Sequence, residues 1–189
     1  MFITKKIKYS FLAEKLRAFS KFKSFSNSVA KNAYVTESEK GGEGLYSRKN
    51  FKKGAVVFIA RGPVRYGNFI GSECYLHPDW YGVDKNTWIA PTYPSIKINH
   101  SCRPNTGIFS ARCFVALRDI NKGDELTFDY SISDDEEVWI MGPGYPIDCM
   151  CGEDDCRREI RSIQFLNQEN FSNLLPLIPK YLQKVYENK

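Results

Sequence analysis

Three cysteines lie within eight residues near the end of the chain, at a spacing that suits a metal ion. Cys149, Cys151 and Cys156 form a C-x-C-x4-C pattern beside Gly152. Thiolates at this density favour a tetrahedral zinc ion, which takes four ligands, so a fourth ligand must come from elsewhere. A disulfide framework is the weaker interpretation, because the amino terminus lacks the continuous apolar stretch of a secretory signal.

Three earlier segments also carry groups that could do chemistry. They are Gly42-Glu43-Gly44-Leu45, Asn99-His100-Ser101-Cys102-Arg103-Pro104-Asn105 and Gly123-Asp124-Glu125-Leu126-Thr127-Phe128-Asp129-Tyr130. Glycines let a ligand approach the main chain closely, although glycine pairs also mark ordinary turns. Asn99 and His100 could also be a loop-capping amide and a satisfied histidine, and Tyr130 could be a strand-end residue in solvent.

Taken in order, the four segments resemble the SET-domain family of protein lysine methyltransferases, over roughly residues 35–160. The resemblance implies an S-adenosylmethionine site at the opening motif and the Asn-His pair, made of Gly42, Glu43, Gly44, Leu45, Asn99 and His100. It also implies one zinc ion held by Cys102, Cys149, Cys151 and Cys156. Four sulfur ligands leave no open position for water, so we expect this zinc to be structural.

The resemblance places the catalytic positions near the end of the strand-like run 126–130. Tyr130 matches the family's catalytic tyrosine, whose hydroxyl orients the attacking amine. Phe128 matches the phenylalanine/tyrosine switch, where phenylalanine leaves room for di- or trimethyl-lysine, and core packing explains it equally well. Both rings should share one face, because they are alternate residues of one strand. Other aromatic residues that could close a lysine channel are Tyr81, Tyr93, Trp139 and Tyr145.

The implied reaction is methyl transfer to a lysine of a histone or another basic protein tail. A free lysine has a pKa of about 10.4 and is charged at neutral pH. An apolar channel beside a sulfonium would lower that pKa by desolvation and by like charge. The alternatives are a non-histone target, such as a ribosomal protein, and a non-catalytic module that binds lysine-containing peptides. The acidic run 134–137 could attract a basic tail, or it could be a solvated loop.

Short apolar runs divided by glycine turns predict strands over 55–60, 113–117 and 126–130. We therefore expect a mostly β fold with short helices, and the resemblance implies small sheets around a pseudoknot. The expected organisation is a basic extension over 1–33, a SET domain over 34–140 and a post-SET zinc segment over 141–160. A helical tail broken by Pro176 and Pro179 should follow over 161–189.

The positive charge is concentrated at one end of the chain. Residues 1–33 sum to +7 and the other residues to −2, which gives the net charge of +5, so the rest of the chain is near neutral and requires no nucleic-acid partner. Apolar spacing predicts a helix over 9–25, which could be a docked helix, an organelle transit peptide, or a tail that binds membrane surfaces or nucleic acid. We expect an intracellular protein of nucleus or cytoplasm, or of an organelle if this segment is a transit peptide. The sequence contains no run of about 18 apolar residues, so it predicts no membrane span.

Overall fold

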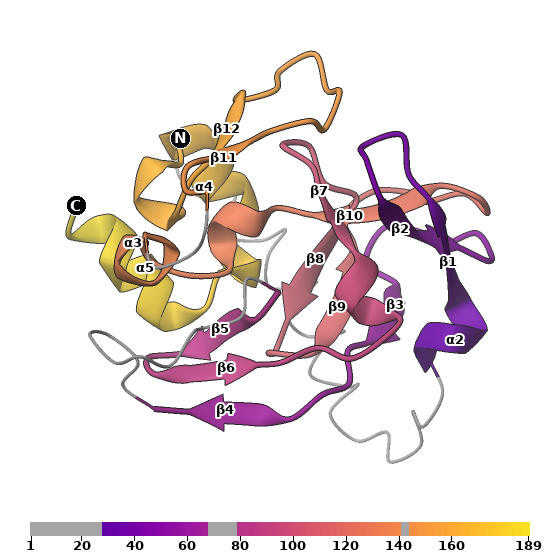
Figure 1. Ribbon diagram of the computed structural model, residues 1–189, viewed down its shortest axis with the longest axis horizontal. Coiled ribbons are helices and arrows are strands. Elements are labelled where there is room, and N and C mark those ends of the chain that lie inside the picture. Colours follow the sequence, from indigo (N-terminus) through magenta and orange to yellow (C-terminus); the bar gives the residue numbers. More distant parts are fainter. Residues whose placement is uncertain (1–27, 68–78, 141–143) are drawn as a thin grey trace, which may run out of the picture.

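Small β-sheets joined by short helices make up the part of the chain that the computed structural model describes, residues 28–67, 79–140 and 144–189 (Figure 1). The sheets contain two to four strands each, which confirms the predicted fold class. The predicted helix over 9–25 lies outside the described residues, so the interpretations of the N-terminal segment stay predictions. No described helix is both long enough and apolar enough to cross a bilayer.

The largest sheet brings three of the chemistry-bearing segments together. Its strand order is β1 (Ala33–Glu37), β2 (Glu43–Ser47), β10 (Glu125–Phe128) and β7 (Asn99–His100), and the short helix α2 (Ser28–Asn32) precedes it. β10 runs antiparallel to β2 and parallel to β7, where Thr127 pairs with Asn99 and Phe128 with His100. The GxG motif and the Asn-His pair therefore flank the same central strand.

Two three-stranded sheets support this arrangement. One has the order β3 (Val56–Ile59), β9 (Cys113–Ala116) and β8 (Thr106–Phe109), and the other β4 (Val64–Tyr66), β6 (Thr87–Ile89) and β5 (Tyr81–Asp84). β3 and β9 confirm the strands predicted over 55–60 and 113–117. The β4–β6–β5 sheet forms the lower edge of the view in Figure 1.

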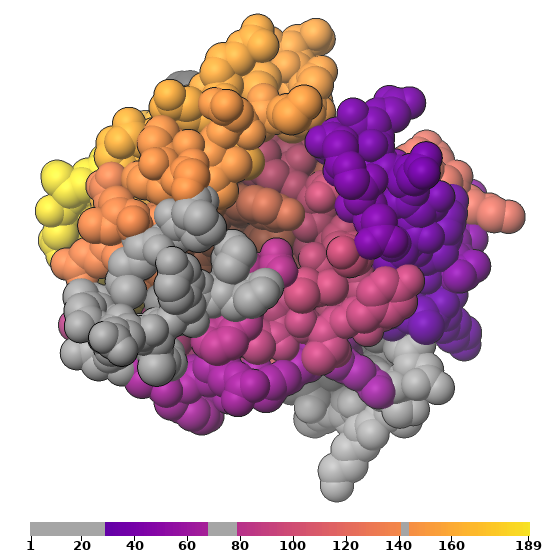
Figure 2. Space-filling view, in the orientation of Figure 1, coloured from indigo at the N-terminus to yellow at the C-terminus, as the bar shows by residue number. Residues whose placement is uncertain are grey.

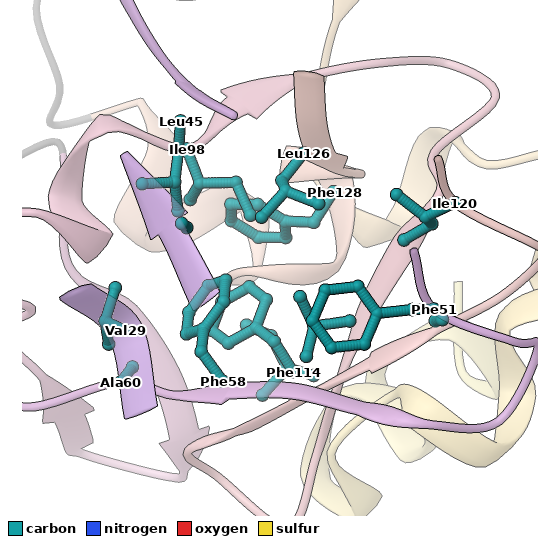
Figure 3. Close-up of a cluster of buried hydrophobic side chains, with 14 of the residues drawn as sticks. Val29, Leu45, Phe51, Phe58, Ala60, Ile98, Phe114, Ile120, Leu126 and Phe128 are labelled. Atoms are coloured by element: carbon teal, nitrogen blue, oxygen red, sulfur yellow. The ribbon is translucent and has the colours of Figure 1, made fainter. Parts of the chain in front are cut away.

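A chain of aromatic rings leads from the main core to the predicted catalytic residues, and Figure 3 shows its first three members, Phe58, Phe114 and Phe128. Phe58 stacks on Phe114 with ring centroids 4.4 Å apart, and Phe114 meets the ring of Phe128 edge-on at 5.7 Å. The rings of Phe128 and Tyr130 follow at 4.9 Å. Rigid aromatic packing of this kind fixes the positions of both side chains.

The last part of the chain forms a small hairpin and then a helical layer. The elements are β11 (Ile147–Asp148), β12 (Glu159–Ile160), α4 (Gln168–Leu174), the 3-10 turn η4 (Leu175–Leu177) and α5 (Lys180–Glu187). Breaks at Pro176 and Pro179 confirm the predicted helical pieces. Ile163 and Leu182 are fully buried in a second apolar cluster, which also contains Val115 of β9.

Candidate active site and metal centre

Four cysteine sulfurs meet beside the end of β7. The Sγ atoms of Cys102, Cys149, Cys151 and Cys156 all lie within 4.8 Å of one another, and those of Cys102 and Cys149 are 3.7 Å apart. A tetrahedral zinc with Zn–S bonds of about 2.3 Å would place its sulfurs roughly 3.8 Å apart. The donor set therefore fits a closed zinc site, and these are the four residues that the resemblance implied.

Backbone hydrogen bonds of the β11–β12 hairpin hold two of these cysteines in place. Cys149 N–H donates to the carbonyl of Arg158 at 2.7 Å, and Cys156 N–H to that of Glu153 at 3.0 Å. Gly152 has a φ of +74°, which favours glycine at this turn. The N–H of Arg157 donates to the Cys102 sulfur at 3.4 Å, so the two parts of the cluster are joined directly.

An ion pair that the sequence did not reveal joins the cysteine segment to β10. The guanidinium of Arg157 donates to both carboxylate oxygens of Asp129, at 2.8 and 2.6 Å. Asp129 is only 1% exposed. Bidentate pairing is the strongest geometry for an arginine and a carboxylate, and a buried charge requires such a partner. Arg157 therefore positions the chain immediately before Tyr130.

His100, predicted to bind the cofactor, is buried between Tyr130 and the cysteines. Its Nδ1 accepts the backbone N–H of Tyr130 at 3.1 Å, and its Nε2 lies 3.4 Å from the sulfur of Cys102. Burial lowers the pKa of His100 to about 4, although Asp129 opposes the shift. The ring is therefore neutral, and this network assigns its proton to Nε2, where it can donate to sulfur.

The predicted cofactor residues of β2 and β7 meet at one carboxylate. The Asn99 amide donates to Glu125 Oε1 at 2.8 Å and to the carbonyl of Glu43 at 3.1 Å. A Cβ at Gly44 would clash with the Glu125 carboxylate, so this close approach requires glycine. The side chain of Leu45 is fully buried in the core, which leaves only its backbone available to a ligand.

Glu125 also fixes the turn between β1 and β2, a role that the sequence did not reveal. Its carboxylate accepts hydrogen bonds from Ser38 Oγ at 2.8 Å and from Lys40 Nζ at 2.6 Å. Burial opposes its charge, but the hydrogen bonds from Lys40, Asn99 and Ser38 prevail and lower the pKa of Glu125. The carboxylate thus stays charged and holds the GxG hairpin against Asn99.

Tyr130 lies beyond the strand that was expected to end with it. β10 ends at Phe128, and Tyr130 begins the 3-10 turn η2 (Tyr130–Ile132) because Asp129 caps it by accepting the N–H of Ser131 at 3.0 Å. The expected strand end is therefore wrong by two residues, although both rings still line one cavity. The Tyr130 hydroxyl donates to the carbonyl of Ile98 at 2.7 Å. Burial raises the pKa of Tyr130 well above its usual value, so this hydroxyl is a neutral donor.

A cavity of about 170 Å³ opens beside these two rings. Its aromatic lining consists largely of Tyr81, Trp88, Phe128, Tyr130, Trp139 and Tyr145. Three of the four aromatic residues suggested as channel residues line this cavity: Tyr81, Trp139 and Tyr145. The fourth, Tyr93, is exposed and is not part of the lining. The Tyr81 hydroxyl is buried and has no hydrogen-bond partner among the described residues. Figure 2 shows the surface hollowed between the orange C-terminal segment and the pink strands.

The acidic run 134–137 is not a solvated loop. Asp134 is 4% exposed and lines the cavity, while Asp135 caps the short helix α3 (Glu136–Trp139) by accepting the N–H of Val138 at 3.2 Å. The local sequence could not predict that Asp134 is buried and that Asp135 caps a helix, because burial depends on which distant residues pack against the run. Only the first carboxylate of the run is placed to influence a bound ligand.

Comparison with known proteins identifies one domain of this chain. Residues 42–131 match the family model described as SET domain. Histone-lysine N-methyltransferase Su(var)3-9 of Drosophila melanogaster is 36% identical over 74 residues, covering 32% of this chain and 12% of that protein. Histone-lysine N-methyltransferase trithorax of Drosophila virilis is 30% identical over 137 residues, covering 62% of this chain and 3% of that protein.

A solved structure supports the same assignment. The crystal structure of KRYPTONITE in complex with mCHH DNA, H3(1-15) peptide and SAH aligns with a TM-score of 0.51 and 25% identity, covering 68% of this chain and 29% of that one. Residues 42–131 therefore form a SET domain, of the family that includes the histone-lysine methyltransferases. This chain spans only a small part of the length of each of these relatives.

Proposed function

We propose that the protein is an S-adenosylmethionine-dependent protein lysine N-methyltransferase that acts on a histone or another basic protein tail. The observation that carries this proposal is the aromatic cavity, with Phe128 and Tyr130 in its wall, beside the strand pair β7–β10. The relatives named as histone-lysine methyltransferases support the reaction class, and the H3 peptide bound to KRYPTONITE supports a lysine-containing peptide as substrate.

The cavity suits the requirements of an attacking lysine amine. Aromatic walls admit the alkyl stem and exclude water, which disfavours the charged ammonium and lowers its pKa. Tyr130, a neutral hydroxyl held by the carbonyl of Ile98, can orient the amine without removing its proton outright. These residues align and desolvate the nucleophile, which is the protein's main part in a direct displacement.

S-Adenosylmethionine, when bound, supplies the methyl group and the leaving group. Gly42, Glu43 and Gly44 would hold it through the backbone of the β1–β2 hairpin, and Asn99 would complete the site with His100 behind it. Glu125 stabilises this cradle because it links the hairpin to Asn99. Zinc bound by the four cysteines would fix the C-terminal segment against the same loop.

The product is expected to be di- or trimethyl-lysine, because Phe128 offers no hydroxyl to hold a water beside the target nitrogen. The cavity would then leave room beside the target nitrogen for a methylated amine to rotate and react again.

Labelled S-adenosylmethionine, incubated with a panel of histones and ribosomal proteins, tests the proposal. Mass spectrometry of each labelled band should find methyl-lysine, and the matched Tyr130→Phe variant should label far less. A wild-type protein that binds the cofactor and labels no lysine in any of these proteins would instead be a peptide-binding module.

A further inference from the structure

The carboxylate of Asp134 lies between the cavity and the C-terminal helix α5. Its Oδ2 accepts a hydrogen bond from the indole Nε1 of Trp88, and its Oδ1 accepts one from the Tyr181 hydroxyl at 3.2 Å. The N–H of Asp135 also donates to Oδ1, at 3.1 Å. Trp88 and Asp134 both line the cavity, whereas Tyr181 belongs to α5. One carboxylate therefore connects the cavity wall to the helical tail.

Among the described residues, this carboxylate has hydrogen-bond donors but no cationic partner. In the part of the chain that the structure describes, no lysine, arginine or histidine forms an ion pair with Asp134. Burial raises the pKa of Asp134 to about 7, against the hydrogen bond from Trp88. A buried carboxylate of this kind is costly, and its position in the cavity wall makes it a candidate for a role in the site.

The backbone around Gly82 is shaped to admit Tyr181. A Cβ at Gly82 would clash with the Tyr181 hydroxyl, and the N–H of Gly82 donates to the carbonyl of Ser133 at 2.6 Å. β5, the 133–134 segment and α5 therefore converge at the point where the hydroxyl meets the carboxylate. No side chain other than hydrogen would fit at residue 82 without displacing Tyr181.

We propose that Asp134 is a positioning residue of the substrate site, which holds the Trp88 indole in the cavity wall and is itself held by Tyr181 of α5. The proposal rests on the proposed function, because the ligand of the cavity is taken to be a lysine side chain. A tryptophan face is a large and rigid apolar surface against which the alkyl stem of a lysine can pack, and the hydrogen bond to Asp134 fixes the orientation of that face. The helical tail thus sets how well the cavity receives its substrate.

The first test follows the indole itself and needs no turnover. The full-length protein is labelled with 5-fluorotryptophan, and the Trp88 resonance is assigned with Trp88→Phe. Tyr181→Phe, which removes only the hydroxyl, should shift this resonance. Tyr186→Phe in the same helix is the matched control. It should leave the Trp88 resonance unchanged, because Tyr186 stacks on Phe171 and is not part of the cavity lining.

The second test measures affinity for a fluorescent histone H3(1–15) peptide by anisotropy, with saturating S-adenosylhomocysteine. Trp88→Phe should weaken binding about tenfold and Tyr181→Phe about fivefold, with cofactor affinity unchanged. The double variant should bind no more weakly than Trp88→Phe alone, because Tyr181 acts through Trp88. A purely structural tyrosine would lower thermal stability without weakening the peptide complex.

Either of two results overturns the proposal. The first is a Trp88 resonance that does not shift in Tyr181→Phe, and the second is a double variant whose loss of affinity equals the product of the two single losses. A wild-type protein that neither binds nor labels the H3 peptide contradicts the histone substrate, not the link between Tyr181 and Trp88. In that case a shifted Trp88 resonance still supports the positioning role, and an unmoved one still overturns it.

Discussion

Arg157 clasps Asp129 with both terminal nitrogens of its guanidinium, at 2.8 and 2.6 Å. The arginine directly follows the last cysteine of the cluster, and the aspartate directly precedes the predicted catalytic Tyr130. This ion pair and the shared sulfur cluster are therefore two links between the C-terminal segment and the candidate active site.

Replacing Arg157 should destabilise the protein strongly. Arg157→Ala leaves the Asp129 carboxylate buried without a cation, which typically costs about 3–5 kcal/mol. Arg158→Ala is the matched control, because Arg158 is exposed in the same turn and should change little. Urea denaturation of the zinc-loaded proteins measures the difference. Equal midpoints for the two variants would show that solvent or another cation compensates Asp129.

The purified protein should contain about one zinc ion, bound in part by a cysteine 47 residues before the next ligand in the chain. Cys102→Ser should lower zinc occupancy, measured by elemental analysis, because serine is a far weaker ligand for this site. Cys113→Ser serves as the control, since Cys113 lies outside the cluster. Full occupancy and full activity in Cys102→Ser would refute the four-cysteine site.

Tyr130→Phe should reduce turnover far more than cofactor affinity. Its hydroxyl is held by the carbonyl of Ile98, and its loss should misalign the amine at the transfer step while leaving the GxG cradle intact. Single-turnover labelling and calorimetric titration with S-adenosylhomocysteine separate the two effects. A parallel loss of cofactor binding would mark Tyr130 as a structural residue.

Phe128→Tyr should shift the product toward monomethyl-lysine with activity retained. The new hydroxyl could hold a water where a methylated amine would otherwise rotate. Intact-peptide mass spectrometry at long incubation and excess cofactor measures the distribution. If the wild type already stops at monomethyl-lysine, another group closes the channel, and the buried hydroxyl of Tyr81 is the first to test by Tyr81→Phe.

The stability of the folded protein should depend on pH in a way that reports the raised pKa of Asp134. The pKa of Asp134 is about 7 in the folded protein, against 3.8 for a free aspartate side chain. Asp134 therefore keeps its proton up to a higher pH in the folded state than in the unfolded chain. Its contribution to stability therefore falls as pH rises from about 4 to about 7 and then levels off. Asp134→Asn should remove this slope, whereas Glu187→Gln, an exposed change in α5, should keep it. Denaturation midpoints at pH 5 and pH 8 make the comparison.

The sequence predicted what depends on local pattern and on resemblance. Short apolar runs located β3 and β9, and the prolines located the breaks in the helical tail. The spacing of three cysteines indicated a metal site, while the fourth, Cys102, came only from the resemblance. The structure brings all four sulfurs together.

The contacts between distant segments could not be predicted. Arg157 and Glu125 were ordinary charged residues in the sequence, and their partners became apparent only once the strands were paired. The end of β10 was misplaced because the capping carboxylate of Asp129 outweighs the strand preference of its neighbours. The burial of Asp134 was missed for a related reason, since its cover comes from Trp88 and from α5.

The second apolar cluster sets a lower limit on the length of chain that can fold. Val115 and Ile132 are buried there against Ile163 and Leu182, which lie well beyond residue 131, where the family match ends. A fragment trimmed to that match would expose this cluster to water and would leave Asp129 without Arg157. On the ribosome, we therefore expect the candidate active site to reach its final shape only after α5 has emerged.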